Sequence, residues 1–373
     1  MGALDGIRIL DLSRILAGPW ATQMLSDLGA DVVKVEADWG DDTRKWGPPF
    51  IEDDAAYFHA CNRGKRSIIL DIKSDDGIEL LHRLIDRADV IVENFRTGTL
   101  EKLGLSSEIF EGKILCRITG YGQTGPRASE PGYDIALQAM TGIMSVTGAA
   151  DGEPAKVGVA WIDVLTGMTA GNGILAALFH RERTGEGQII DLSLFDVALM
   201  AMVNQAQNWI ASGNDPTRMG HAHPNIVPYQ AFQAKDEWFI LACGNDAQFI
   251  GVCEATGAQE LLRSELADNA GRLAARDEIV ETLSVIIRQQ TVDHWISVFN
   301  QHGVPCTPIL SVSEAFGDIQ AMARGALWNI SGQDSVANAL RFMSKTPAQP
   351  GLRPPNLGEH TDEIMADWLG DEK

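Results

Sequence analysis

Asp163 is the residue whose type and surroundings best fit a chemical role, because apolar side chains flank it within residues 157–167. A carboxylate in such a collar could attack an activated acyl group and form a covalent intermediate, while the collar keeps water from the reactive anhydride. A place at the start of a helix would favour the ionised form. The same place also fits a plain helix N-cap, which aspartate favours. The residues alone leave both interpretations open.

Basic residues are concentrated in one part of an otherwise acidic chain, at Arg63, Lys65, Arg66, Lys73, Arg96 and Lys102. Several follow predicted strand ends, so they would lie on one rim of a sheet. Charge-assisted hydrogen bonds from such a rim could hold a ligand with several phosphates. The alternative is a set of surface cations that pair with the abundant Asp and Glu side chains.

The turn at residues 14–19 follows the first predicted strand, and in a doubly wound sheet such a turn lies where ligands bind. A dinucleotide fold needs Gly-x-Gly-x-x-Gly there, but only Gly18 is present. A Gly-x-x-x-x-Gly-Lys-Ser/Thr segment is also absent from the sequence. A nicotinamide cofactor and a nucleotide triphosphate are therefore not expected. His221 and His223 have no third ligand in view, so no metal site is assigned.

The charge balance limits the partners. The 373 residues include 51 acidic and 30 basic ones, for a formal net charge of −21 at pH 7. Such a charge repels phosphate backbones and anionic lipid, so neither nucleic acid nor a membrane is expected as a partner. The five cysteines include no Cys-x-x-Cys pair, and no apolar run reaches the roughly 18 residues of a spanning helix. The start lacks the basic region of a signal peptide. These features predict a cytoplasmic protein of about two domains.

Strand-like and helix-like segments alternate in the N-terminal part. Strands are predicted at 7–12, 31–35, 67–72, 89–92, 114–118 and 189–194. Helices are predicted at 20–28, 75–87, 163–183 and 195–210. This alternation is typical of βαβ units, so we expect an α/β fold with a parallel sheet. Gly167, Gly171 and Gly173 lie inside the third helix. Because each costs about 1 kcal/mol there, they suggest close approach of another backbone or a ligand.

The composition also predicts the domain organisation. Residues 1–210 are assigned to a large domain, 211–228 to a linker rich in turn-forming residues, and 229–325 to a smaller α+β domain. In the smaller domain, 229–243 is typical of a strand pair and 269–302 of two helices. The proline-rich stretch at 347–355 is expected to be extended.

Several ordered motifs resemble those of one known family. They are LDLSRILAGP at 10–19, GADVVKVE at 29–36, NRGKRSIILDIK at 62–73, ENFR at 93–96, TGYGQTGP at 119–126, GYD at 132–134 and PPNLGEHT at 354–361. With the Asp163 segment, they make the chain similar to the class III CoA-transferases, the CaiB–BaiF group, over nearly its whole length. The resemblance favours the nucleophile over the N-cap at Asp163.

The resemblance implies an acyl-CoA:carboxylate CoA-transferase. In that family an aspartate, here Asp163, takes the acyl group of a CoA thioester as a mixed anhydride. The CoA thiolate then attacks to give an aspartyl-CoA thioester, and an acceptor carboxylate completes the exchange. The implied partners are an acyl-CoA and a free carboxylic acid, with no permanently bound cofactor and no metal.

The resemblance also implies a CoA site. Leu16 and Ala17 would line the cleft, and Arg44 would contact a phosphate. The remaining residues would hold the nucleotide and pantetheine or line the same site: Leu70, Asp71, Ile72, Lys73, Asn94, Phe95, Lys102 and Tyr133. The implied fold has a Rossmann-like large domain and a smaller domain in an interlaced homodimer, with residues 326–373 returning to the large domain.

Two other functions stay open. Acyl-CoA racemases or epimerases of the same superfamily carry a histidine where this chain has Tyr133, and a tyrosine is a poor base at neutral pH. A non-catalytic acyl-CoA binding protein would keep the fold without the covalent step. The stretch 242–249 has a single glycine and so lacks the glycine-rich loop of oxalate-specific members. That stretch and residues 225–232 look more like members that handle dicarboxylic acids.

Overall fold

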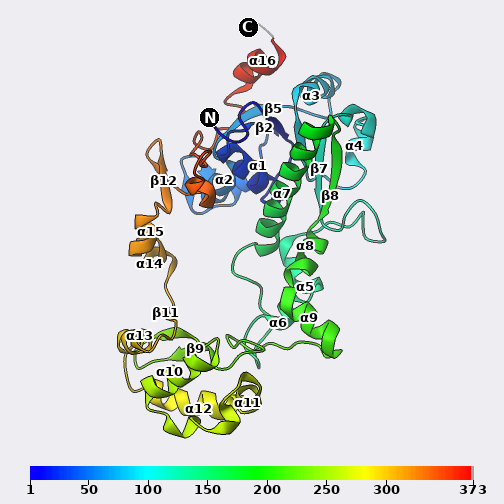
Figure 1. Ribbon diagram of the computed structural model, residues 1–373. Coiled ribbons are helices and arrows are strands. Elements are labelled where there is room, and N and C mark those ends of the chain that lie inside the picture. The colour runs from blue at the N-terminus through cyan, green and yellow to red at the C-terminus, as the bar shows by residue number, and fades with distance from the viewer. Residues whose placement is uncertain (371–373) are drawn as a thin grey trace. The chain divides into compact units, whose positions relative to one another are not determined.

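The computed structural model describes residues 1–370, which form two compact units (Figure 1). The first unit comprises Met1–Ile143, Lys156–Asn214 and the chain from Met322 onward. The second comprises Met144–Ala155 and Asp215–Ala321. The segment Met144–Ala155 was expected in the large domain, but it clusters with the second unit.

A six-stranded parallel sheet forms the centre of the first unit, in the order β5-β2-β1-β6-β7-β8. Its strands are β1 (Arg8–Asp11), β2 (Asp31–Glu36), β5 (Lys65–Ile69), β6 (Val90–Glu93), β7 (Ile114–Thr119) and β8 (Gln188–Ser193). Each coincides with a predicted strand to within a few residues, so the predicted α/β class with a parallel sheet is confirmed. The register pairs Ile9 with Val32 on one side and with Val90 on the other.

Alternating side chains of the sheet enter two cores. Ile9, Val32 and Val90 face α1 (Ala17–Asp27) and α7 (Trp161–Thr184), together with α5 (Asp134–Met140) and α8 (Leu194–Ala201). Leu10, Val33 and Ile91 face α3 (Asp75–Arg87) and the C-terminal α16 (Thr361–Leu369). Helices on both faces explain why the strands are apolar throughout and do not alternate.

Helix α7 packs closely on α1, and Gly167 permits this. A Cβ at Gly167 would lie 2.6 Å from the Ala17 carbonyl oxygen, which is closer than such atoms approach. The expected close approach of a backbone is therefore confirmed at Gly167. At Gly171 and Gly173 a Cβ would meet only side chains, at ordinary distances of 3.6 and 3.5 Å. In length and composition α7 also fits a membrane span, but its contacts with the sheet and α1 identify it as a core helix.

The remaining elements of the first unit are short. The helices are α2 (Ala56–Asn62), α4 (Thr99–Lys102), α9 (Val203–Ser212) and, at the boundary between the units, α15 (Ile319–Ala323). Two hairpins are also present. In one, β3 (Phe50–Ile51) pairs with β4 (Asp54–Ala55), and in the other, β12 (Leu327–Ile330) pairs with β13 (Gln333–Val336). The helix predicted over 195–210 is thus two helices, α8 and α9. They are separated where Val203 adopts a φ of 35°.

The second unit has a sheet of three antiparallel strands, in the order β11-β10-β9. Its elements are β9 (Tyr229–Gln233), β10 (Trp238–Ala242), β11 (Cys306–Pro308), α10 (Asp246–Thr256), α11 (Asn269–Ala274), α12 (Arg276–Ile287), α13 (Val292–Gln301) and α14 (Val312–Gly317), with α6 (Ile143–Val146) at its border. The strand pair agrees with β9 and β10, whereas 269–302 contains three helices and not two.

Candidate active site

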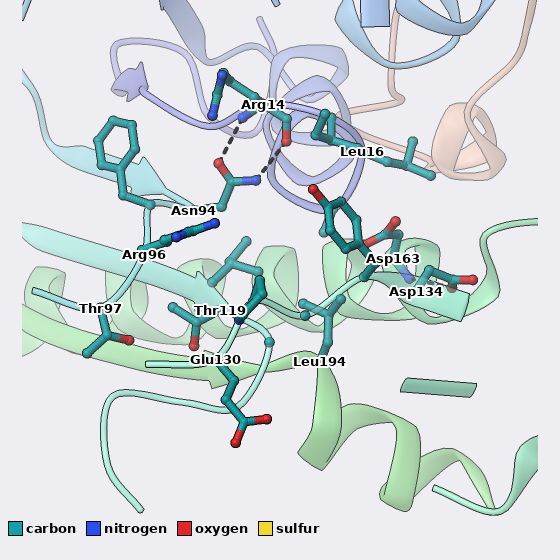
Figure 2. Close-up of a pocket in the computed structure, with 18 of the residues that line it drawn as sticks. Arg14, Leu16, Asn94, Arg96, Thr97, Thr119, Glu130, Asp134, Asp163 and Leu194 are labelled. Atoms are coloured by element: carbon teal, nitrogen blue, oxygen red, sulfur yellow. Dashed lines mark hydrogen bonds between the residues drawn. The ribbon is translucent and has the colours of Figure 1, made fainter. Parts of the chain in front are cut away.

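Two adjoining cavities lie at the carboxyl edge of the parallel sheet, and Figure 2 shows the larger one. The strand order reverses between β1 and β6, and the loops that follow such strands diverge and leave room for a ligand. The larger cavity, about 730 Å³, is lined by these loops, the end of β7 and the first turn of α7. The smaller, about 300 Å³, shares Arg14, Phe95 and Thr99 with it. The shared residues make them two parts of one candidate site.

Asn94 joins the two loops. Its side-chain amide donates to the Arg14 carbonyl oxygen at 2.7 Å, and its Oδ1 accepts from the Arg14 amide at 2.9 Å, as the dashed lines in Figure 2 show. The next residue, Ile15, has a φ of 74°, which is strained for a β-branched side chain. Its amide donates to Asp41, which also accepts from the Lys34 ammonium at 2.9 Å. Buried charge therefore holds the strained loop in place.

Three of the basic residues are committed to ion pairs with carboxylates of the protein. Lys65 Nζ lies 2.9 Å from Asp11 Oδ2, and both side chains are inaccessible to solvent. Arg63 forms a similar buried ion pair, at 2.6 Å to Asp27, and Arg66 lies 2.7 Å from the partly exposed Asp31. Lys65 and Arg63 form their ion pairs in the interior, whereas Arg66 pairs with carboxylates at the surface, as the alternative held. They do not form the predicted phosphate-binding rim.

Arg44 also requires a correction. Its guanidinium lies 2.7 Å from Glu36 Oε2 and 2.6 Å from Asp54 Oδ2, and it stacks over the Phe58 ring at 3.7 Å. It is only 5% exposed and lines neither cavity. Because its donors are already engaged, the expected phosphate contact is contradicted.

Asp163 is the third residue of α7 and lines the larger cavity. It is not the N-cap, a position that Ala160 holds without a side-chain bond. Asp134 takes over capping: its Oδ1 accepts from the Ile162 amide at 2.7 Å and from the Asp163 amide at 3.4 Å. The other Asp134 oxygen accepts from the Gln138 side chain at 2.6 Å. The N-cap interpretation of Asp163 is therefore wrong, and its carboxylate faces the cavity (Figure 2).

The pKa of Asp163 is raised to about 7, first because burial disfavours its charge and then because Asp134 is negative. We expected the helix N-terminus to favour ionisation, but Asp134 already occupies its first amides. Tyr57 on α2 is affected in turn. Burial, followed by the charge of Asp163, raises the pKa of the Tyr57 hydroxyl to about 12, so it stays protonated. Its ring packs edge-on against Trp46, which lines the larger cavity, at 5.3 Å.

The predicted CoA-binding residues divide between the cavities. The larger one is lined by Leu16, Ala17, Asn94, Phe95 and Tyr133, together with Asp163. The smaller one is lined by Leu70, Asp71, Ile72, Lys73 and Phe95. Lys102 is exposed on α4 and lines neither cavity. The structure thus brings together the segments after β1, β5 and β6.

Sequence reasoning missed several residues of the larger cavity. Asp134 was noticed only as part of a motif, although an aspartate opening a short helix is a recognisable capping signal. Asp42 begins a short 3-10 helix (Asp42–Lys45) and Trp46 directly follows it, but neither belongs to a chemical motif, so no signal could have identified them. Tyr57 could not be linked to Asp163, because only the tertiary fold places α2 near the start of α7.

Known proteins match this chain over its length. The family model for CoA-transferase family III matches residues 4–361. A succinate–glutarate CoA-transferase of Agrobacterium fabrum is 44% identical, over 98% of this chain and 95% of that protein. An acetyl-CoA:oxalate CoA-transferase of Acetobacter aceti is 37% identical, over 100% of this chain and 97% of that protein. The crystal structure of a CAIB/BAIF family protein from Brucella suis has a TM-score of 0.89 at 46% identity, covering 98% of this chain and 99% of that one.

These matches agree with the resemblance that the motifs implied, because the family model covers most of the chain and the relatives are similar to it over nearly their whole length. The chain therefore belongs to CoA-transferase family III and is a class III CoA-transferase.

Proposed function

We propose that Asp163 is the nucleophile that carries CoA between two carboxylic acids. Its carboxylate oxygen attacks the carbonyl carbon of a donor thioester, which gives a mixed anhydride and expels CoA as a thiolate. The thiolate then attacks the Asp163 carbonyl, forming an aspartyl-CoA thioester and releasing the donor acid. An acceptor carboxylate attacks that thioester, and the expelled thiolate then attacks the acceptor carbonyl of the new anhydride. The products are a new acyl-CoA and free Asp163.

One observation carries this proposal: Asp163 lines the larger cavity while Asp134 satisfies the helix terminus in its place. A carboxylate that caps a helix is held by amides and is a weaker nucleophile. Asp163 is released from that task, and its pKa of about 7 makes its carboxylate a stronger base and nucleophile than an ordinary one, while part of it stays ionised at neutral pH. The hydroxyl of Tyr57, which stays protonated, is a donor near the charge of Asp163.

The adjoining cavities support a path for CoA. We place the nucleotide in the smaller cavity, where Leu70–Lys73 line one wall and Lys73 supplies a cation. The pantetheine arm would pass Phe95, which both cavities share, toward Asp163. Lys102 would reach the phosphates from α4. No resident cofactor is needed, because CoA enters as part of the substrate.

The relatives support dicarboxylic acids as substrates, because their names specify succinate, glutarate and oxalate. Oxalate itself is not expected here, since the stretch 242–249 has a single glycine. We also propose a cytoplasmic homodimer with interlaced chains. The first unit exposes large apolar side chains on α7, α8 and α9, including Phe179, Met200, Val203, Trp209 and Ile210. A second copy that covered this face would remove them from water.

A racemase is the weaker alternative. Tyr133 is 65% exposed and occupies the position where racemases carry histidine, and a phenol is a poor base at neutral pH. A racemase would exchange an α-hydrogen of acyl-CoA with deuterated water in the absence of a second acid. That exchange is not expected here.

The test is to trap the covalent intermediate. The protein is incubated with succinyl-CoA, treated with hydroxylamine and digested, and the peptides are analysed by mass spectrometry. The wild type should carry a modification localised to Asp163 and should transfer CoA to glutarate. Asp163→Ala should show neither. An Asp163→Ala variant that transfers CoA at the normal rate would end the proposal, and a variant that binds CoA equally well would show that the fold is intact.

A further inference from the structure

Arg96 is a charged residue of the larger cavity that the steps above leave unused. It follows β6 by three residues and lines the cavity that also contains Asp163. Figure 2 shows its side chain extending from the end of β6 toward the interior of the cavity, on the wall opposite Asp163 and Asp134. Its position places a positive charge across the cavity from the proposed nucleophile.

The charges around this cavity are unevenly compensated. Four carboxylates line it: Asp42, Glu130, Asp134 and Asp163. The lining cations are Arg14 and Arg96. Arg14 pairs with Asp42 at 3.2 Å, and Glu130 pairs with Arg127 at 3.1 Å. Within residues 1–370, no ion pair joins Arg96 to a carboxylate.

A second unsatisfied polar group belongs to the next residue in the chain. The hydroxyl oxygen of Thr97 is buried and has no hydrogen-bond partner among the described residues, and Thr97 also lines the cavity. A buried donor without a partner costs free energy that a ligand acceptor can recover. In Figure 2 the Thr97 side chain points away from the Arg96 guanidinium, so an anion at the Arg96 position would be held by the guanidinium alone.

An acid with two carboxylates needs such a cation. One carboxylate reacts at Asp163, while the other stays ionised and would be repelled by the carboxylates of the cavity. A guanidinium can hold it through two parallel hydrogen bonds. We propose that Arg96 binds the distal carboxylate of a dicarboxylic substrate and so selects dicarboxylic over monocarboxylic acids. This inference rests on the proposed CoA-transfer at Asp163.

The competing source of an anion is a phosphate of CoA, and the experiment separates the two. With succinyl-CoA as donor, kcat/KM is measured for glutarate and for pentanoate, which has the same chain length but one carboxylate. The donor is common to both reactions, so the ratio of the two values reports only the acceptor. Arg96→Gln is compared with the wild type, with Arg96→Lys, and with Arg288→Gln, which removes an exposed arginine of the second unit.

We expect Arg96→Gln to lower the glutarate-to-pentanoate ratio by about 10- to 100-fold, because a site built to bind a polar group rejects the analogue that lacks it. Arg96→Lys should recover part of the ratio, and Arg288→Gln should leave it unchanged. The dissociation constant of free CoA, measured by calorimetry, should be the same for all variants. Equal losses for both acids, or weaker CoA binding by Arg96→Gln, would assign Arg96 to a phosphate and overturn the inference. A wild type that transfers CoA to neither acid would instead refute the proposed function.

Discussion

Asp11 and Asp163 belong to the same unit but have opposite surroundings. Asp11 ends β1 and accepts from Lys65 Nζ at 2.9 Å, from Thr22 Oγ1 at 2.7 Å and from Ser13. Burial alone would raise the pKa of Asp11, but the charges of Lys65 and Lys34 outweigh it and lower the pKa to about 2. Asp163 has burial without a cation, and its neighbour Asp134 is negative, so its pKa rises to about 7.

The difference separates a structural carboxylate from a reactive one. Asp11 is satisfied by its partners, and it accepts from the Ser13 amide at the start of the loop that contains Ile15. Asp163 lacks such partners, and its charge is costly within the protein. Strongly perturbed acids in a cavity are frequent at active sites, because the same lack of compensation that destabilises a charge makes it reactive. The two carboxylates therefore differ in role because their partners differ, although their residue type is the same.

The largest effect on stability is expected at Asp11. Asp11→Asn keeps the shape but leaves the buried Lys65 and Lys34 with less compensation, so we expect a loss of about 3–5 kcal/mol in the free energy of unfolding. Urea denaturation at pH 7 measures it. Because the pKa of Asp11 is lowered, this contribution is present above the ordinary pKa and is lost as the pH falls toward 2. The exposed Asp53 is the control, and Asp53→Asn should change stability by less than about 0.5 kcal/mol. A loss below about 1 kcal/mol for Asp11→Asn would contradict the structural role.

The opposite change is expected at Asp163. Asp163→Asn removes a charge that the fold does not compensate, so we expect a gain of about 1–3 kcal/mol at pH 8 together with loss of transfer. Because the pKa of Asp163 is raised to about 7, the wild type loses stability as the pH rises from about 4 to about 7. The gain should therefore shrink as the pH is lowered and vanish near pH 4. Denaturation curves of both proteins across this range measure it, and equal stabilities at pH 8 would refute the idea.

The smallest expected effect is a shift in the pH dependence of activity and not a change in stability. Asn at position 134 can still accept from the Ile162 amide but carries no charge, so Asp134→Asn should lower the pKa of Asp163. The acid limb of kcat/KM, expected near pH 7 in the wild type, should move to lower pH by up to about one unit. The acid limb should still lie above the pKa of an ordinary carboxyl group, because burial is the larger cause of the raised pKa of Asp163 and the substitution does not change it.

Glu130→Gln is the matched control for this limb. Glu130 lines the same cavity but is not among the charges that raise the pKa of Asp163. The acid limb of kcat/KM for Glu130→Gln should coincide with that of the wild type, even if the rate of the variant differs. If Asp134→Asn leaves the limb unmoved while Glu130→Gln moves it, the assignment of the neighbouring charge is wrong.

Local patterns in the sequence determined most elements of the first unit. The predicted helix over 75–87 agrees with α3 at both ends, because Ser74 caps it and a clear apolar stripe follows. The strands of the parallel sheet were recognisable as short apolar runs between helices. The break between α8 and α9 was not recognisable, because an apolar helical pattern continues across it. Only the backbone at Val203 departs from helical geometry.

The sequence alone also singled out Asp163 and the family, because an aspartate in an apolar segment and a set of ordered motifs are local features. Only the tertiary structure decided what each charge does. Lys65 pairs with Asp11 across 54 residues, and Arg44 reaches the Pro355 carbonyl across 311. Asp134 caps a helix that begins 27 positions later, at Trp161. Periodicity is set by neighbours along the chain, whereas the charge state of a carboxylate depends on neighbours in space, and the fold alone supplies those.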